Sequence, residues 1–321
     1  MKIFLIGVVL LAGLGYGGSK AYIHYQVSDK VDSVIPLVSP YMDLQYGGIS
    51  STLTGELTID DVVIRVNGYR DAIVIGRLGI NTPSYLDLIK LSRLSADSGA
   101  RENVPPEYFG LLAENIRVSA SADYYRDYYD ESIKALAPAD IRQGGVQCVG
   151  KYGYSPRALK ALGYEELVMS MSMIMRQADT HFNTEMTFDI VDMIDVEIDV
   201  SMEGGVMEGA AMGSAYQPRL RNLQLKLTDK SLKQRVVKYC TELGLTSAQI
   251  LRAHINALQY AGGQFGMEFD KHVIEPYKEY LTDKSIFVAT ANPGEPIYLT
   301  KIGRYKPIDV PALLNLAAIA R

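Results

Sequence analysis

The residues whose spacing most resembles a known reactive site are the glycines of GLGYGG, residues 13–18. A G-x-G-x-x-G loop binds phosphates when it follows a strand, opens a helix and precedes an acidic residue by about 20 positions. Here the residues before it are the N-terminal MKIFLIGVVLLA, and residues 3–19 carry no charge. This context is typical of a membrane or targeting segment, in which glycine is common. In this context the glycine motif does not indicate a nucleotide-binding site.

Three carboxylates at alternate positions, Asp195, Glu197 and Asp199, form the next candidate. Alternate side chains of a strand share a face, so this row could hold a cation or act as an acid–base pair in a periplasmic hydrolase. Acids on the outer face of a half-solvated sheet also keep a protein soluble, and Lys226 on a neighbouring strand can pair with them. The solvated face is the favoured interpretation.

Histidine and serine patterns give no further chemistry. The four histidines are scattered, none lies in an H-E-x-x-H motif, and no G-x-S-x-G elbow occurs. His254 fits a half-buried packing position on a helix. We therefore expect no enzyme activity, no cofactor and no metal.

The two cysteines, Cys148 and Cys240, are expected to form a disulfide, because an even cysteine count in an exported chain favours a bridge. The bridge would close a loop of about 90 residues and stabilise the fold by roughly 4 to 5 kcal/mol. The alternative is two separate buried thiols. No C-x-x-C motif suggests thiol exchange.

Residues 1–26 are expected to form an N-terminal signal anchor that holds the chain in an inner membrane through residues 3–23. The uncharged stretch is at the lower limit of the roughly 20 residues that a spanning helix needs. Tyr22 and Tyr25 suit the headgroup zone, and Lys20 can reach it. Cleavage after Ala21 is the alternative. In both cases residues 27–321 form one exported, periplasmic domain.

Composition limits the partners. A net charge of −5 with mixed signs and no basic block argues against nucleic acid as a partner. The chain has no tryptophan but 22 tyrosines, four of them in DYYRDYYD. This cluster is either an element edge packed by tyrosines or a patch for a protein partner; its residues are Tyr124, Tyr125, Tyr128 and Tyr129.

Hydrophobic periodicity predicts an α+β fold with a long, curved antiparallel sheet. Residues 41–228 are rich in strands, including a hairpin around Asn67-Gly68 with a bulge at Asp60-Asp61, and a period-two alternation from 182 to 202. Residues 123–147 show no readable pattern. A helical insertion at 229–282 includes a capping box at Thr246 and Gln249. Two returning strands, SIFVAT and EPIYLTKI, and a tail helix, VPALLNLAAIAR, complete residues 283–321.

The apolar face of these strands is the main candidate for function. Methionine suits adaptable apolar surfaces, and nine of the twelve methionines fall between 169 and 212. This face is either a core under the helices or a groove for an apolar ligand. The groove candidates are Met169, Met171, Met173, Met175, Met186, Phe188, Ile194, Val196 and Ile198.

The stretches YGGISSTLTGELTIDDVVIRV, IGRLGINTPSYLDLIKL and TANPGEPIYLTKI resemble those of AsmA-like and YdgA-like proteins of the Gram-negative envelope. The resemblance implies an inner-membrane anchor, a periplasmic curved sheet with an apolar groove, and a role in envelope biogenesis or phospholipid handling without catalysis. This chain is too short to span a periplasm, which argues against bulk transfer between membranes. The alternative function is a scaffold for envelope proteins that has no groove.

Overall fold

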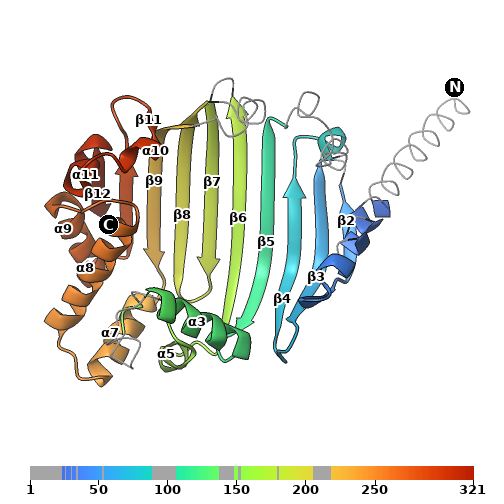
Figure 1. Cartoon of the computed structure of the whole chain (residues 1–321), viewed down its shortest axis with the longest axis horizontal. Helices are drawn as coiled ribbons and strands as arrows, with labels where there is room; N and C mark the ends of the chain where they lie inside the picture. The colour runs from blue at the N-terminus through green and yellow to red at the C-terminus, as the bar shows by residue number, and fades with distance from the viewer. Residues whose placement is uncertain are drawn as a thin grey trace, which may run out of the picture.

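The computed structural model shows an α+β fold built on one open, antiparallel sheet of twelve strands (Figure 1). It describes residues 24–88 apart from 26, 30, 34 and 53, and residues 106–136, 148–150, 153–178, 181–204 and 218–321. The expected long antiparallel sheet with a helical insertion towards the C-terminus is confirmed. The expected membrane segment at residues 3–23 lies outside the described residues.

The sheet is a meander, in which neighbouring strands follow one another along the chain. Its order is β1-β3-β4-β5-β6-β7-β8-β9-β10-β12, while β2 also pairs with β3 and β11 also pairs with β9. The strands are β1 (Met42–Gln45), β2 (Gly48–Ser51), β3 (Glu56–Val66), β4 (Ala72–Asn81), β5 (Tyr108–Ser119), β6 (Glu166–Ala178), β7 (His181–Ile190), β8 (Ile194–Glu203), β9 (Arg219–Asp229), β10 (Ile286–Ala291), β11 (Ile297–Tyr298) and β12 (Leu316–Ala320).

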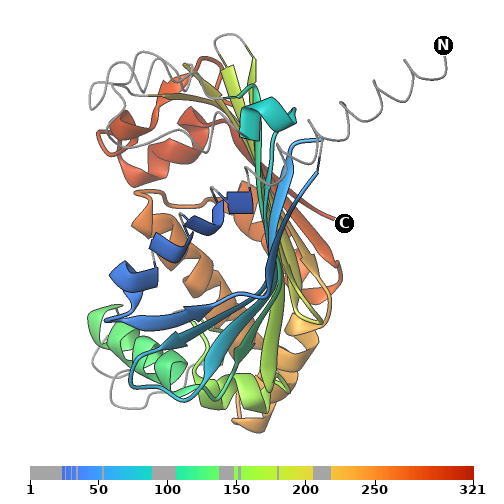
Figure 2. The same cartoon turned by 90° about the vertical axis from the view of Figure 1, so that its right-hand side faces the viewer.

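Several helices interrupt the meander, beginning with a short one at residues 85–88 between β4 and β5. α3 (Asp123–Leu136) and α5 (Pro156–Ala161) lie between β5 and β6, and α7 (Leu232–Glu242), α8 (Ser247–Gln264) and α9 (Lys271–Thr282) lie between β9 and β10. The short α10 (Leu299–Ile302) and α11 (Val310–Leu313) precede β12. Figure 2 shows the green α3, the red C-terminal helices and the blue N-terminal residues on the concave side of the curved sheet.

Local sequence signals fix where the helices begin. Thr246 and Gln249 form the expected capping box at the start of α8. The Ser155 side chain caps α5. The Asp229 carboxylate accepts a hydrogen bond from the backbone N–H of Lys233 at 3.0 Å, in the first turn of α7. These polar groups satisfy N–H donors that a helix leaves without internal partners.

Cross-strand register separates an apolar face from a polar one. In β7 and β8, Met186 pairs with Ile198 on the concave face, whereas Glu185 pairs with Asp199 on the convex face. The expected alternation over 182–202 is confirmed, but it belongs to two strands joined by a turn at residues 191–193. Even-numbered residues stay on the same face on both sides of the turn, because even-numbered residues of β7 pair with even-numbered residues of β8 throughout.

A line of bulges bends the N-terminal half of the sheet. Asp61 of β3, Gly76 of β4 and Asn115 of β5 lie beside one another and are left out of the regular strand pairing. Each of these strands therefore holds one residue more than regular alternation requires, at the same position along the sheet. The shift ends at β6, where Ser170 alone lies opposite two residues of β5. Asp61 and Asn115 both have a φ of 54°. The bulge expected at Asp60-Asp61 is thus confirmed as part of a wider feature that curves the sheet.

Helices cover the two ends and the C-terminal third of the concave face. α9 places Val273 and Tyr280 against Phe287 of β10. At the end of the sheet near α3, the buried disulfide Cys148–Cys240 lies in a cluster with residues of α5 and α7. The expected bridge is confirmed, with a Cα–Cα distance of 5.3 Å and a separation of 92 residues.

Two expectations for regular structure were wrong and one was incomplete. The tail was expected to be helical, but after the single turn of α11 the residues LAAIA form β12 beside β10. Pairing with β10 and contact of Leu316, Ala318 and Ala320 with the α9 cluster outweigh the helix propensity of alanine. The strand expected in EPIYLTKI is limited to Ile297–Tyr298, because α10 follows at once. The part of residues 123–147 that is described contains α3, for which the sequence showed no readable pattern.

Candidate ligand-binding groove

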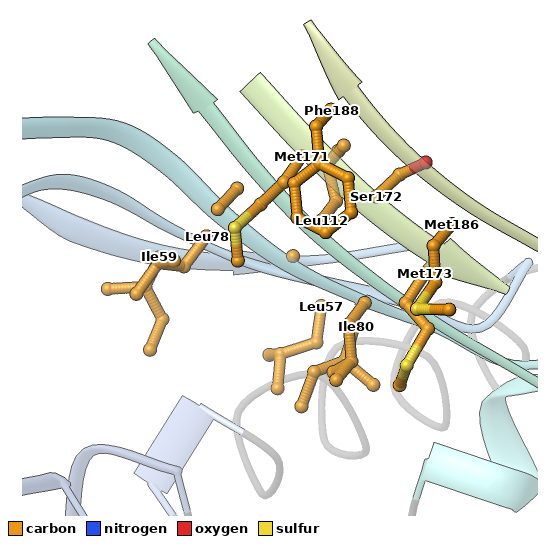
Figure 3. A pocket seen from close by; sticks show the side chains of 13 residues that line it. Leu57, Ile59, Leu78, Ile80, Leu112, Met171, Ser172, Met173, Met186 and Phe188 are labelled. Carbon is orange, nitrogen blue, oxygen red and sulfur yellow. The ribbon is translucent and has the colours of Figure 1, made fainter. Parts of the chain in front are cut away.

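An apolar groove runs across the middle of the concave face. Two rows of paired residues form its floor: Leu57, Ile80, Leu111, Met173 and Met186 in one, and Ile59, Leu78, Ala113, Met171 and Phe188 in the other. The rows cross β3 to β7, and the groove has a volume of about 450 Å³. Figure 3 shows the methionines and Phe188 on one side of it and the aliphatic side chains of β3 and β4 on the other.

The floor of the groove is only partly covered. The side chains of Met171 and Phe188 are 43% and 38% exposed, and Leu111 is also exposed. Met202 and Phe287, the latter covered by α9, lie on the same face of the sheet but are buried. The C-terminal part of the apolar face is therefore ordinary hydrophobic core. The part between β3 and β7 is left open by the described residues.

Among the described residues, the groove offers no group for acid, base or nucleophilic chemistry. No titratable side chain is found in the described lining, and the hydroxyl of Ser172 lies on the convex side of β6, where it hydrogen-bonds to Thr187 with an O···O distance of 2.7 Å. Binding here would rest on the hydrophobic effect and dispersion. The flexible, polarizable methionines can adjust to the shape of an apolar molecule.

The structure brings together four of the nine expected groove residues: Met171, Met173, Met186 and Phe188. The other five lie on the same face but outside the groove lining, and Ile194 packs in the disulfide cluster. Sequence reasoning missed the opposite wall, formed by β3, β4 and β5. Its signal was the apolar alternation of the 56–81 hairpin, but the strand order was needed to place that hairpin beside the methionines.

The acidic row lies on the convex face, where two of its three members are paired with cations and the third, Asp199, accepts a hydrogen bond from the Gln224 side-chain amide at 3.4 Å. Glu197 contacts Lys226 at 2.8 Å, as expected, and Asp195 contacts Lys230 at 2.6 Å. Burial lowers the pKa of Lys230, but its hydrogen bonds and charge contacts with Asp189 and Asp195 outweigh this, so the pKa is raised overall. These pairs fit a solvated face. Among the described residues, no group of three or more His, Cys, Asp or Glu side chains could hold a metal ion.

The tyrosines of α3 share a helix but not a single exposed face. The Tyr125 hydroxyl donates to the Tyr154 carbonyl at 2.7 Å and the ring packs in the disulfide cluster. Tyr124 stacks edge-on against Tyr69, with ring centroids 6.1 Å apart. Tyr128 is 70% exposed, whereas Tyr129 is half-buried. An interaction patch at this site would therefore centre on Tyr128.

His254 lies on α8, and burial lowers its pKa to about 4. This position agrees with a packing histidine that stays neutral at physiological pH. The His181 ring contacts the Arg221 guanidinium on the convex face. Neither histidine lines the groove.

Comparisons with known proteins add a partial match. No helix in the described part of the chain combines the length and apolarity that a membrane crossing requires. A search of curated proteins found no match. A family model described as "Uncharacterized protein" matches residues 165–321, a little under half of the chain. The matched part begins at β6, so it includes the methionine wall of the groove and the C-terminal helices but not the wall formed by β3, β4 and β5.

Proposed function

We propose that this protein is a non-catalytic component of the cell envelope that binds a lipid or another apolar ligand in the groove. In this proposal residues 3–23 anchor the chain in the inner membrane, and the domain of residues 27–321 lies in the periplasm. The observation that carries the proposal is the exposed, entirely apolar floor between β3 and β7. The AsmA-like and YdgA-like sequence patterns support the same placement.

The size and composition of the groove suit an acyl chain. A volume of about 450 Å³ falls within the range of roughly 300 to 1,000 Å³ found for small-molecule sites. Each methylene transferred from water to such a surface contributes about 0.8 kcal/mol. Because the described lining has no charged group, a chain of methylenes can be buried there without removing an ion from water.

A protein-partner scaffold of the envelope is the second candidate. The observation that favours it is the exposed ring of Tyr128 on α3, since tyrosine is enriched in interface cores. Under this alternative the groove would carry no lipid, and a Tyr128→Ala substitution would abolish capture of the partner.

Photo-crosslinking in cells tests the groove directly. The full chain is expressed in cells fed a fatty acid that carries a diazirine and an alkyne, and labelled peptides are mapped by mass spectrometry. Met171→Glu places a charge on the exposed floor of β6, whereas Asn183→Glu places one on the convex face of β7 beside Arg176. We expect labelled peptides from β6 and β7 in the wild type and in Asn183→Glu.

Met171→Glu should lose most of the label while keeping the circular dichroism spectrum and protease resistance of the wild type. Absence of label from a folded wild-type protein would overturn the proposal and leave the apolar floor without a lipid. Unfolding of Met171→Glu would identify the floor as core, and it would also count against the proposal.

A further inference from the structure

The width of the groove fits one acyl chain. Its two rows of side chains are about 7 Å apart, because side chains on one face of a strand repeat at every second residue. Among the described residues, the next rows on either side add nothing to the lining: one row holds Ile75, Ile116 and Met169, and the other holds Phe109 and Met175. The two rows therefore form a single trough, which cannot hold two chains side by side.

The length of the groove is limited at both ends. Its lining crosses the neighbouring strands β3 to β7, so the floor is about 19 Å long at a strand spacing of about 4.8 Å. At the β3 end, Leu57 is buried in a cluster with Tyr85 and Leu88. Beyond β7 the two rows continue with Val196 and Ile198 of β8, and neither of these residues lines the groove.

We infer that the groove binds one extended acyl chain of about 15 carbons, which lies across the strands from β3 to β7. Carbon–carbon bonds of about 1.5 Å at tetrahedral angles advance about 1.25 Å per carbon, so about 15 carbons match a floor of about 19 Å. This inference rests on the proposed function and specifies its ligand. A fatty acid, a lysophospholipid and one arm of a diacyl phospholipid share this chemistry.

The test measures how affinity depends on chain length. The full chain is held in a detergent-free amphipathic polymer, and equilibrium binding is measured for isotope-labelled saturated fatty acids from octanoic to eicosanoic acid. We expect the affinity to rise about 2- to 4-fold with each methylene up to about 15 carbons, because each methylene is partly removed from water on the open floor. Longer chains should gain nothing further, since the floor ends.

Substitutions in the middle of the floor should shorten the limit. Leu111→Trp on β5 and Met171→Trp on β6 each replace an exposed side chain with a ring that blocks the trough. Each leaves at most two strand spacings free, about 10 Å, so the affinity should level off at about 8 carbons. Val74→Trp on β4 is the matched control and should keep the wild-type limit. Val74 is exposed on the opposite face, because its neighbour Ile75 packs with Ala113 of the floor.

Competition against labelled hexadecanoic acid distinguishes the sources of the chain. Competition by both hexadecanoyl lysophospholipid and dihexadecanoyl phospholipid would show that one arm of a phospholipid enters the groove while the other stays outside. Competition by the lysophospholipid alone would assign the groove to single-chain lipids. Binding of two fatty acids per protein chain, both lost in Met171→Trp, would overturn the inference.

Failure of the inference can be separated from failure of the proposed function. If the wild type binds no fatty acid, the groove does not bind acyl chains and both fail. If affinity keeps rising well beyond about 15 carbons, or if folded Leu111→Trp keeps the wild-type limit, the groove binds acyl chains but its inferred length is wrong. If circular dichroism shows that both floor variants are unfolded, these side chains are core and the inference is wrong. Loss of fatty acid to the polymer is the same for every variant, so it cannot make Leu111→Trp differ from Val74→Trp.

Discussion

Removing the disulfide should strongly destabilise the described fold. Cys148 and Cys240 are 92 residues apart in sequence, so the bridge closes a long loop in the unfolded chain. According to the chain-entropy relation, a bridge that closes a loop of this length lowers the entropy of the unfolded chain by about 16 cal/mol/K. This corresponds to about 4.6 kcal/mol of stability at 25 °C. We expect the Cys148→Ala/Cys240→Ala variant to lose about this much free energy of unfolding.

Urea unfolding followed by circular dichroism measures this loss, since the chain has no tryptophan for fluorescence. Wild-type protein unfolded in the presence of a thiol reductant is the control, because it loses the covalent link but keeps both sulfur atoms in the cluster. The slope of the free energy against urea should rise in both cases as the unfolded chain expands. A loss under about 1 kcal/mol with an unchanged slope would refute the entropic account.

Four further predictions concern single residues. Because burial holds the pKa of His254 near 4, below its value of about 6.5 in an unfolded chain, the unfolded state binds the proton first. The free energy of unfolding of the wild type should therefore fall by about 3 kcal/mol more than that of His254→Gln between pH 7 and pH 4. Urea unfolding at several pH values measures both, and an equal pH dependence of the two proteins would contradict this prediction. Met202→Ala should cost about 2 to 5 kcal/mol and Met171→Ala under about 1, since only Met202 is buried; equal losses would show that Met171 is core. Gly55→Ala should destabilise far more than Gly68→Ala in thermal melts, because both have positive φ but a Cβ on Gly55 would lie 2.5 Å from the Thr82 carbonyl oxygen. Tyr85→Phe should gain about 1 kcal/mol of stability, because the buried Tyr85 hydroxyl has no hydrogen-bond partner among the described residues; a loss of that size would reveal a hidden hydrogen bond.

Much of the fold could be predicted from local pattern. Parity alone predicted which residues of β7 and β8 share a face, because a half-buried strand repeats with a period of two. The disulfide was predicted from the cysteine count and the expectation of an exported chain, and the capping box from two residues three apart. Each of these inferences uses residues close in sequence or a simple covalent rule.

The rest depended on contacts between distant residues. Leu57 and Met173 line the same groove although more than 100 positions separate them, and only the order of the strands brings them together. The strand β12 has a sequence suited to a helix, and its pairing partner β10 decides its structure. Tyr85 could not be singled out from sequence, because an unpartnered hydroxyl is defined by everything that surrounds it.

The meander order of the sheet has a consequence for how such a groove can change in size. Each of β3 to β9 pairs with the strand before it and the strand after it. One pair of antiparallel strands can therefore be inserted or deleted without changing the order of the other strands. Inward and outward positions keep their parity when two strands are added together. The width of the apolar floor is therefore a modular property, which engineering can adjust one hairpin at a time while both helical ends stay in place.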